Sequence, residues 1–133
     1  MQFIVQNVLL IAIAIVAALA LFLPKINARR YGPEVDPEGA IALINQKNAL
    51  PVDLRKPKEY RDGHIAGAVN YPFDSFAADL EKLPKDRTIL LVDELGAFSR
   101  KAVRMLHAAG YADTAVLDGG LTAWGKEKLP LVK

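Results

Sequence analysis

The feature that most limits the fold is a run over residues 3–23 that contains no charged side chain. Within it, residues 8–23 contain no polar side chain either. As a helix rising about 1.5 Å per residue, the run would span about 30 Å, the thickness of a bilayer's hydrocarbon core. A buried core helix is usually shorter and has a polar face. We therefore predict a transmembrane anchor over residues 1–24 that contacts the lipid bilayer through residues 3–23.

A cleaved signal peptide is the alternative interpretation of this run. Such a peptide has a basic amino-terminal region, a shorter apolar core and small residues at its cleavage site. Here no basic side chain precedes the run, and Pro24 and Lys25 follow it. The next segment, residues 25–35, is a basic juxtamembrane linker with Lys25, Arg29 and Arg30. Since basic flanks stay on the cytoplasmic side, we expect the carboxy-terminal domain to face the cytoplasm.

The charge balance and the cysteine count limit which partners and which reactions are possible for the rest of the chain. The sequence has 17 Lys and Arg, and setting aside the three in the linker leaves 14 against 15 Asp and Glu. A domain so near neutrality argues against nucleic acid as a partner. The sequence contains no cysteine, which excludes disulfides, thiolate metal sites and thiol catalysis.

Short apolar runs alternate with helical patterns over residues 36–133, which indicates one α/β domain. Asp36 followed by Pro37 predicts a helix start, and the apolar stripe that follows continues to about Asn48. A helix capped by Asp74 or Ser75 is expected to reach residue 83. Strands are expected at 50–54, about 68–70, 88–92 and 114–117, and further helices at 99–109 and 121–128. This alternation predicts a doubly wound parallel sheet.

The loop between the strand at 88–92 and the helix at 99–109 occupies a position where a reactive site is expected. Many α/β enzymes place a reactive group between a buried strand and a helix. The loop residues 93–98 read Asp-Glu-Leu-Gly-Ala-Phe and contain no thiol or hydroxyl nucleophile, no imidazole base and no cation. The question is whether the loop keeps any chemistry.

Three stretches together carry a resemblance to a known family, and the shortest of them is Gly110-Tyr111 at a helix exit. "VDLRKPKEYRDGHIAGAVNYP", which includes Asp53, Arg55 and His64, is similar to the amino-terminal signature of rhodanese-like domains. "LDGGLTAW", which includes Gly119, Gly120 and Trp124, is similar to the family's closing segment. The resemblance covers roughly residues 34–132 and implies a five-stranded doubly wound parallel sheet. With the anchor included, the chain resembles single-span rhodanese-like proteins of Gram-negative bacteria, which implies the bacterial inner membrane as its location.

The resemblance also implies an active loop with the pattern Cys-x-x-Gly-x-Arg-Ser. Gly96 and Ser99 match this pattern, whereas Asp93 stands at the cysteine position and Phe98 at the arginine position. We therefore assign no catalytic residue. The loop equivalents remain as candidate binding residues: Asp93, Glu94, Leu95, Gly96, Ala97, Phe98 and Ser99.

The two departures oppose sulfur transfer, because a carboxylate is a hard nucleophile that cannot hold a persulfide. Asp93 is instead expected to accept hydrogen bonds from N–H groups of its own loop and to cap the helix at 99–109. For Phe98 two interpretations stay open, a core side chain or an exposed apolar contact.

The signature residues outside the loop are interpreted as structural. His64 is expected to hydrogen-bond loop backbone, and Trp124 to anchor the core or its edge. Asp53 and Arg55 are expected to pair with nearby charges, Arg61 or Glu59 among them. None of these residues has the spacing of a metal site, and we expect neither a metal nor a cofactor.

These observations favour a catalytically inactive rhodanese-like module on the inner membrane with a protein-interaction or regulatory role. Its expected partner is another membrane or membrane-associated protein, bound through the altered loop. One alternative is a sulfurtransferase that handles thiosulfate or persulfide with a partner's thiol. A second is that the anchor itself binds another helix through its alanines, although an apolar span often contains alanine.

Overall fold

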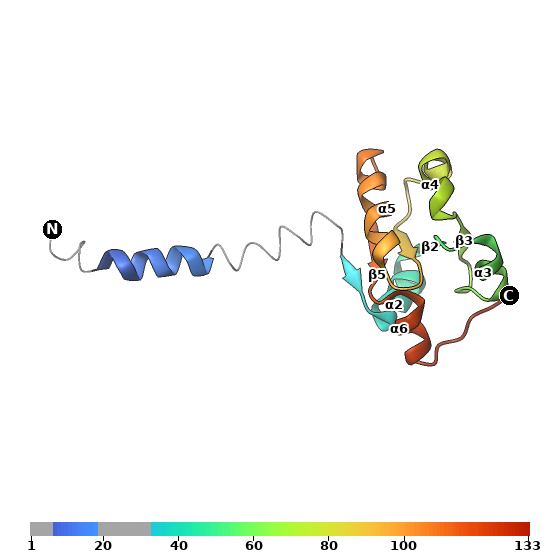
Figure 1. Ribbon diagram of the computed structural model, residues 1–133, viewed down its shortest axis with the longest axis horizontal. Helices are drawn as coiled ribbons and strands as arrows, with labels where there is room; N and C mark the ends of the chain where they lie inside the picture. Colours follow the sequence, from blue (N-terminus) through green and yellow to red (C-terminus); the bar gives the residue numbers. More distant parts are fainter. Residues whose placement is uncertain (1–6, 19–32) are drawn as a thin grey trace. The chain divides into compact units, whose positions relative to one another are not determined.

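The computed structural model describes residues 7–18 and 33–133, which belong to two separate units (Figure 1). Residues 7–18 form a helix, and its large apolar side chains from Val8 to Val16 are exposed. Within the described residues, no helix has the length and hydropathy needed to cross a membrane. The remainder of the predicted span, residues 3–6 and 19–23, and the linker up to residue 32 lie outside the described residues. The transmembrane anchor therefore stays a prediction.

The domain over residues 33–133 is built on one five-stranded sheet. All neighbouring strands are parallel, and their order is β1-β5-β4-β2-β3. This confirms the predicted α/β class and the five-stranded parallel sheet. The elements in chain order are β1 (Glu34–Val35), α2 (Pro37–Lys47), β2 (Leu50–Asp53), α3 (Pro57–Asp62), β3 (Val69–Asn70), α4 (Phe73–Asp79), the 3₁₀ turn η1 (Leu80–Lys82), β4 (Ile89–Val92), α5 (Ala97–Ala108), β5 (Thr114–Leu117) and α6 (Gly120–Lys126).

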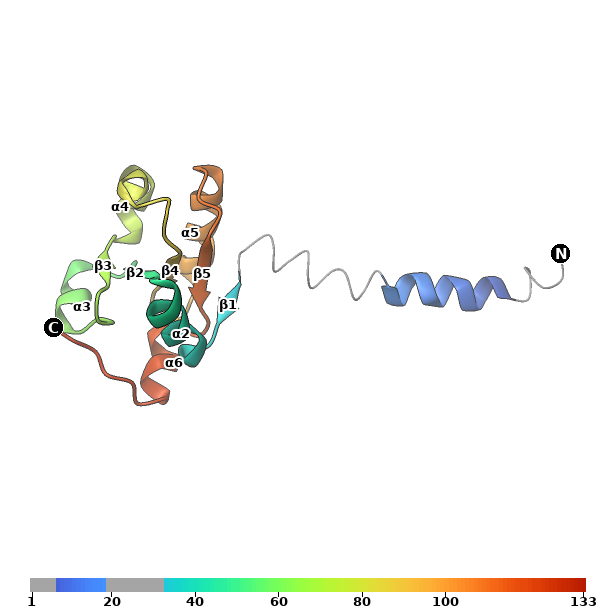
Figure 2. The same ribbon diagram turned by 180° about the vertical axis from the view of Figure 1, so that it is seen from behind.

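Helices cover both faces of this sheet (Figures 1 and 2). Ile89 and Leu91 of β4 pack in one apolar cluster with side chains of α4 and α5. Leu90 and Val92 pack in a second cluster with side chains of α2 and α6. Because successive side chains of a strand point to opposite faces, β4 needs apolar residues at every position. This explains the unbroken apolar run from which the strand was predicted.

Helix α2 begins and ends as the sequence predicts. The Oδ1 atom of Asp36 accepts a hydrogen bond from the N–H of Gly39 at 2.7 Å, and Pro37 occupies the first helical position. The helix stops at Asn48, whose φ of 54° is left-handed and whose N–H is donated to Leu43 O. These local signals suffice because a cap depends only on neighbouring residues.

Two predicted helix starts are wrong. Helix α4 begins at Phe73 behind Pro72, and no side chain caps it, so neither Asp74 nor Ser75 has the predicted role. Helix α5 begins at Ala97 instead of residue 99, because Gly96 turns the chain with a φ of +105° and the helix starts immediately after it. Few L side chains adopt that backbone angle, so glycine favours the early start.

The order of strands defines where a site is expected. Strand β4 lies between β2 and β5. The chain leaves β2 towards β3 on one side, and it leaves β4 towards β5 on the other. In open parallel sheets, ligands bind beyond the carboxyl ends of strands at such a reversal of direction. The loop that follows β4 is therefore in the position of a functional loop.

Candidate functional site

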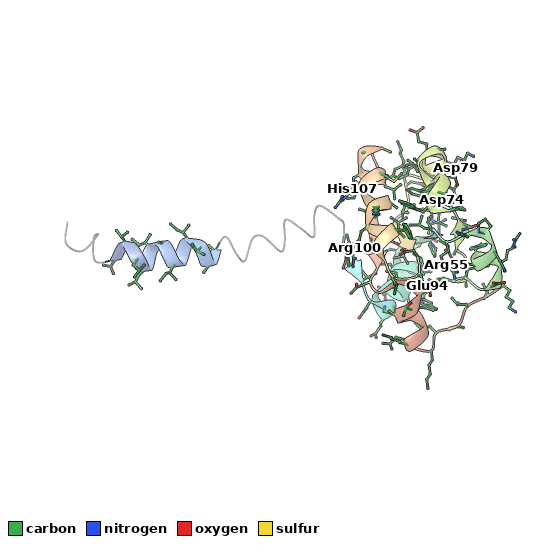
Figure 3. All side chains as sticks on the ribbon, in the orientation of Figure 1. Arg55, Asp74, Asp79, Glu94, Arg100 and His107 are labelled. Atoms are coloured by element: carbon green, nitrogen blue, oxygen red, sulfur yellow. The ribbon has the colours of Figure 1, made fainter. Side chains whose placement is uncertain are left out.

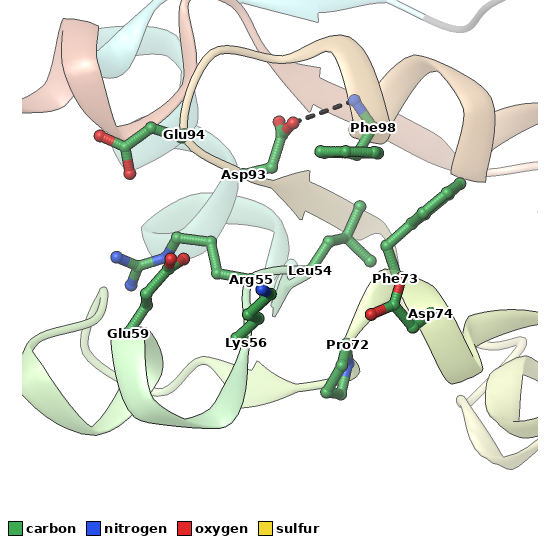
Figure 4. Close-up of a pocket in the computed structure, with 10 residues that line it drawn as sticks. All are labelled: Leu54, Arg55, Lys56, Glu59, Pro72, Phe73, Asp74, Asp93, Glu94 and Phe98. Atoms are coloured by element: carbon green, nitrogen blue, oxygen red, sulfur yellow. Dashed lines mark hydrogen bonds between the residues drawn. The ribbon is translucent and has the colours of Figure 1, made fainter.

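Three segments that follow β2, β3 and β4 meet around a pocket of about 250 Å³ (Figure 4). We call it the loop pocket. It lies at the reversal point between β2 and β4, as the topology requires. The residues that line it are Leu54, Arg55, Lys56, Glu59, Pro72, Phe73, Asp74, Asp93, Glu94 and Phe98.

Asp93 stands directly after β4 with only 2% of its surface exposed. Its Oδ2 atom accepts the backbone N–H of Phe98 at 3.0 Å, and its Oδ1 atom accepts the hydroxyl of Ser99 at 2.7 Å. The carboxylate is thus held by the first turn of α5, whose unpaired N–H groups favour negative charge. The predicted hydrogen bond from a loop N–H to Asp93 is present, and the hydroxyl of the fully buried Ser99 is a further partner.

The backbone of the loop is fixed from its other side by α6. The N–H of Leu121 is donated to Asp93 O at 2.9 Å, and that of Thr122 to Glu94 O at 3.1 Å. Gly120 makes this approach possible: its φ is +58°, and a Cβ there would lie 2.5 Å from Glu94 O and closer still to Asp93 O. Gly120, the first residue of α6, therefore serves the loop.

Arg55 and Asp53 pair with each other, which corrects the expectation that they pair with other charges such as Arg61 or Glu59. The guanidinium donates Nη2–H to Asp53 Oδ2 at 2.8 Å and to Gly63 O at 2.6 Å. Burial lowers the pKa of Arg55, but the hydrogen bond and charge of Asp53, with smaller effects of Glu94 and Glu59, raise it above its ordinary value. This arginine is therefore a fixed cation whose charge is largely neutralised by Asp53.

His64 and Trp124 have structural contacts outside the pocket. The Nδ1–H of His64 is donated to Tyr60 O, with 2.8 Å between the two atoms, and the two rings stack with centroids 3.8 Å apart. Trp124 is 5% exposed and donates its indole N–H to Pro130 O at 3.2 Å. His64 thus binds backbone as predicted, although its acceptor lies in α3 and not in a loop, and the buried Trp124 packs in the core as predicted. Neither residue lines the loop pocket.

The loop presents two apolar side chains at the surface. Leu95 is 64% exposed and Phe98 48% exposed. The Phe98 ring rests against Phe73 with centroids 4.8 Å apart, and Lys101 Nζ lies 5.8 Å from the centroid of the Phe98 ring. Of the two open interpretations of Phe98, the structure supports the exposed apolar contact.

Sequence reasoning missed about half of the pocket. Six lining residues were not predicted as site residues, although they follow the carboxyl ends of β2 and β3: Leu54, Lys56, Glu59, Pro72, Phe73 and Asp74. Their position relative to those strand ends was the available signal.

The charges of the pocket are predominantly negative. The lining has four carboxylates and only two cations, Arg55 and Lys56. The carboxylates are those of Glu59, Asp74, Asp93 and Glu94. Arg55 and Glu94, both labelled in Figure 3, line the pocket, and the charge of Glu94 is one of the effects that raise the pKa of Arg55. In the described part of the chain, no three His, Asp or Glu side chains are grouped to hold a metal ion.

The comparison with protein families decides which fold family this is. The model of the rhodanese-like domain matches residues 36–127, well over half of the chain. The chain belongs to the rhodanese-like family. Within the family it is 38% identical over 97 residues to the uncharacterized protein YibN of Escherichia coli (strain K12), a match that covers 71% of this chain and 68% of YibN.

Other members of the rhodanese-like family include enzymes. The chain is 33% identical over 100 residues to a sulfurtransferase of Allochromatium vinosum, covering 74% of this chain and 94% of that protein. A crystal structure of a rhodanese-related protein from Thermoplasma volcanium superposes with a TM-score of 0.67 at 26% identity, covering 75% of this chain and 97% of that one. This rhodanese-like domain is therefore related to sulfurtransferases.

Proposed function

We propose that this chain is a rhodanese-like module with no sulfur-transfer activity of its own that recognises another protein at the membrane. Residues 3–23 hold it in the bacterial inner membrane with the domain on the cytoplasmic side. The loop 93–99 forms the recognition surface. Its partner is a membrane or membrane-associated protein.

The observation that carries this proposal is the carboxylate of Asp93 inside the turn between β4 and α5. Two donors already bind it there, the N–H of Phe98 and the hydroxyl of Ser99. Sulfane transfer requires a soft thiolate that attacks sulfur and retains it as a persulfide. The sequence has no cysteine to supply one, neither at residue 93 nor elsewhere.

Electrostatics oppose an anionic sulfur substrate at the same place. Another anion about 4 Å from the carboxylate would be repelled by roughly 4 kcal/mol at an intermediate effective dielectric. With Phe98 at the family's arginine position, about 1.5–3 kcal/mol of charged hydrogen bonding is also missing. Both effects weaken the binding of thiosulfate.

The exposed apolar side chains of the loop support protein recognition. Leu95 and Phe98 are both about half exposed or more, and the Phe98 side chain lines the loop pocket. Aromatic side chains next to a pocket often contribute a large share of the free energy of protein binding. The loop has therefore kept its framework while its surface has become apolar.

Three features of the sequence and structure support the membrane location. The run over residues 3–23 has no charge, and basic residues follow it in the linker. Within the run, the helix over residues 7–18 exposes apolar side chains around its whole circumference. Basic residues next to an apolar span are retained in the cytoplasm.

The test is capture of partners from intact membranes by crosslinking, with the double variant Phe98→Ala, Glu94→Arg against the unaltered chain. We expect the loop variant to lose at least one partner, because it removes the exposed ring and reverses a charge at the pocket. The control is Leu131→Ala, Asp86→Arg, which likewise removes a large apolar side chain and reverses an acidic charge at exposed positions outside the pocket. Identical partners for both variants and the unaltered chain would exclude the loop as the recognition surface.

A further inference from the structure

The loop pocket has an apolar floor. Leu54 is 3% exposed at its base, and Pro72, Phe73 and Phe98 complete the apolar wall (Figure 4). Such a floor gains free energy by covering the methylene groups or the ring of an incoming side chain. At about 250 Å³, the pocket is smaller than most sites for small-molecule ligands, which measure about 300–1,000 Å³. Its size fits one or two side chains.

Two of the charged groups in the pocket are satisfied within the domain. The Asp93 carboxylate is bound by the start of α5, and the Arg55 guanidinium is bound by Asp53 and Gly63 O. Neither group is free to recognise a ligand of the opposite charge without losing these contacts.

The charges that remain at the rim are mainly negative. Glu59, Asp74 and Glu94 are exposed carboxylates, and among the lining residues they face one exposed ammonium group, that of Lys56. These carboxylates come from segments after three different strands, so they surround the mouth of the pocket. A ligand that carries positive charge is therefore favoured on several sides.

The Phe98 ring already contacts a cation in this structure. Lys101 Nζ lies 5.8 Å from its centroid, within the range in which ammonium groups interact with aromatic faces. The ring is half exposed and borders the pocket. An aromatic wall of this kind stabilises an arginine or lysine, whose alkyl chain covers the floor while its charge stays near the rim.

From these contacts we infer that the loop pocket takes the arginine or lysine side chain of a partner protein, together with an adjoining apolar side chain. The inference rests on the proposed function and names the chemistry of the partner segment. Charge complementarity favours a basic segment and disfavours an acidic one at the same rim. The site has thus changed from the anion preference implied by the family loop to a preference for cations.

The experiment is photocrosslinking in living cells from a benzoylphenylalanine placed at Leu95, in the whole chain. Mass spectrometry identifies the partner segment that is captured. The yield is compared for Glu94→Lys, for Lys56→Glu and for the control Asp86→Lys. Asp86 is exposed and precedes β4, so it lies at the opposite end of the strand from the pocket.

We expect the captured segment to carry a net positive charge next to an apolar residue. Glu94→Lys should lower the yield and Lys56→Glu should raise it, each by roughly two- to ten-fold, as for reversal of an exposed charge. Asp86→Lys should leave the yield unchanged.

An acidic or uncharged captured segment overturns the inference, and so do yields that move in the same direction for the two reversals. In those cases the loop still captures a protein, so the proposed function stands. If no crosslink depends on the loop at all, the proposed function fails and the inference fails with it.

Discussion

At the scale of a single residue, Asp93 stands where the family's loop pattern has a catalytic cysteine, and its carboxylate has a structural role instead. Its carboxylate is nearly inaccessible, and both of its oxygen atoms are engaged by the turn that it begins. A buried carboxylate is tolerated only where hydrogen bonds compensate its lost hydration. The sequence indicated the backbone contact, since a cap involves near neighbours. It did not indicate the hydroxyl of Ser99, because that contact depends on where α5 begins.

Replacement of Asp93 by alanine should affect stability and not turnover. We expect Asp93→Ala to lower the free energy of unfolding by about 1–3 kcal/mol, since the buried hydroxyl of Ser99 and the N–H of Phe98 lose their acceptor. Urea unfolding in mild detergent, followed by the fluorescence of Trp124, measures this change. The control Asp86→Ala should change it by less than about 0.5 kcal/mol.

Thiosulfate:cyanide turnover separates the structural role of Asp93 from a catalytic one. We expect background rates both for the unaltered chain and for Asp93→Ala. Turnover above background that disappears in the variant would instead support the alternative of a sulfurtransferase.

At the scale of elements, the start of α6 determines the shape of the loop after β4. Two N–H groups of this helix bind the carbonyl oxygens of Asp93 and Glu94, and Gly120 allows the close approach. The sequence predicted the helix and its glycines as family features. It did not reveal the contact with the loop, because the two segments are more than twenty residues apart and meet only when β4 pairs with β5.

Two glycines with left-handed backbones should respond differently to alanine. Gly67 has a φ of +82°, and a Cβ added there would have no other atom within 4 Å. Gly67→Ala should therefore cost only the backbone term of about 1–2 kcal/mol. Gly120→Ala carries a similar term and also brings its Cβ against two carbonyl oxygens. That overlap should cost about 1–3 kcal/mol more and displace the loop.

Urea unfolding of both glycine variants measures the difference, and loop-dependent crosslinking reports on the loop itself. The proposed role of Gly120 requires that only Gly120→Ala reduces the crosslinking. Equal effects of the two variants on stability and on crosslinking would show that contact with the loop contributes nothing.

At the scale of the whole molecule, two units have different apolar surfaces. The domain over residues 33–133 covers both faces of its sheet with its own helices. The helix over residues 7–18 exposes its apolar side chains, which water does not favour. The exposed apolar side chains are accounted for if residues 3–23 lie in a bilayer, as we propose.

Charges within the apolar run should release the protein from membranes. We expect the double variant Leu10→Arg, Val16→Arg to leave the carbonate-resistant membrane fraction, because each arginine near the middle of a span costs about 2.5–3.5 kcal/mol. The control Leu10→Ala, Val16→Ala keeps the run apolar and should stay in that fraction. Retention of the arginine variant, or extraction of the unaltered chain by carbonate, would contradict the anchor.

The sequence by itself determined the α/β class, strand β4 and both ends of α2, since these depend on local patterns of apolar residues and on caps. It also determined the absence of a thiol, which no fold can reverse. Only the tertiary structure decided that Phe98 rests on Phe73 and that acidic side chains from three segments share one pocket. Those contacts depend on which strand ends become neighbours, and strand order is set by packing of the whole sheet.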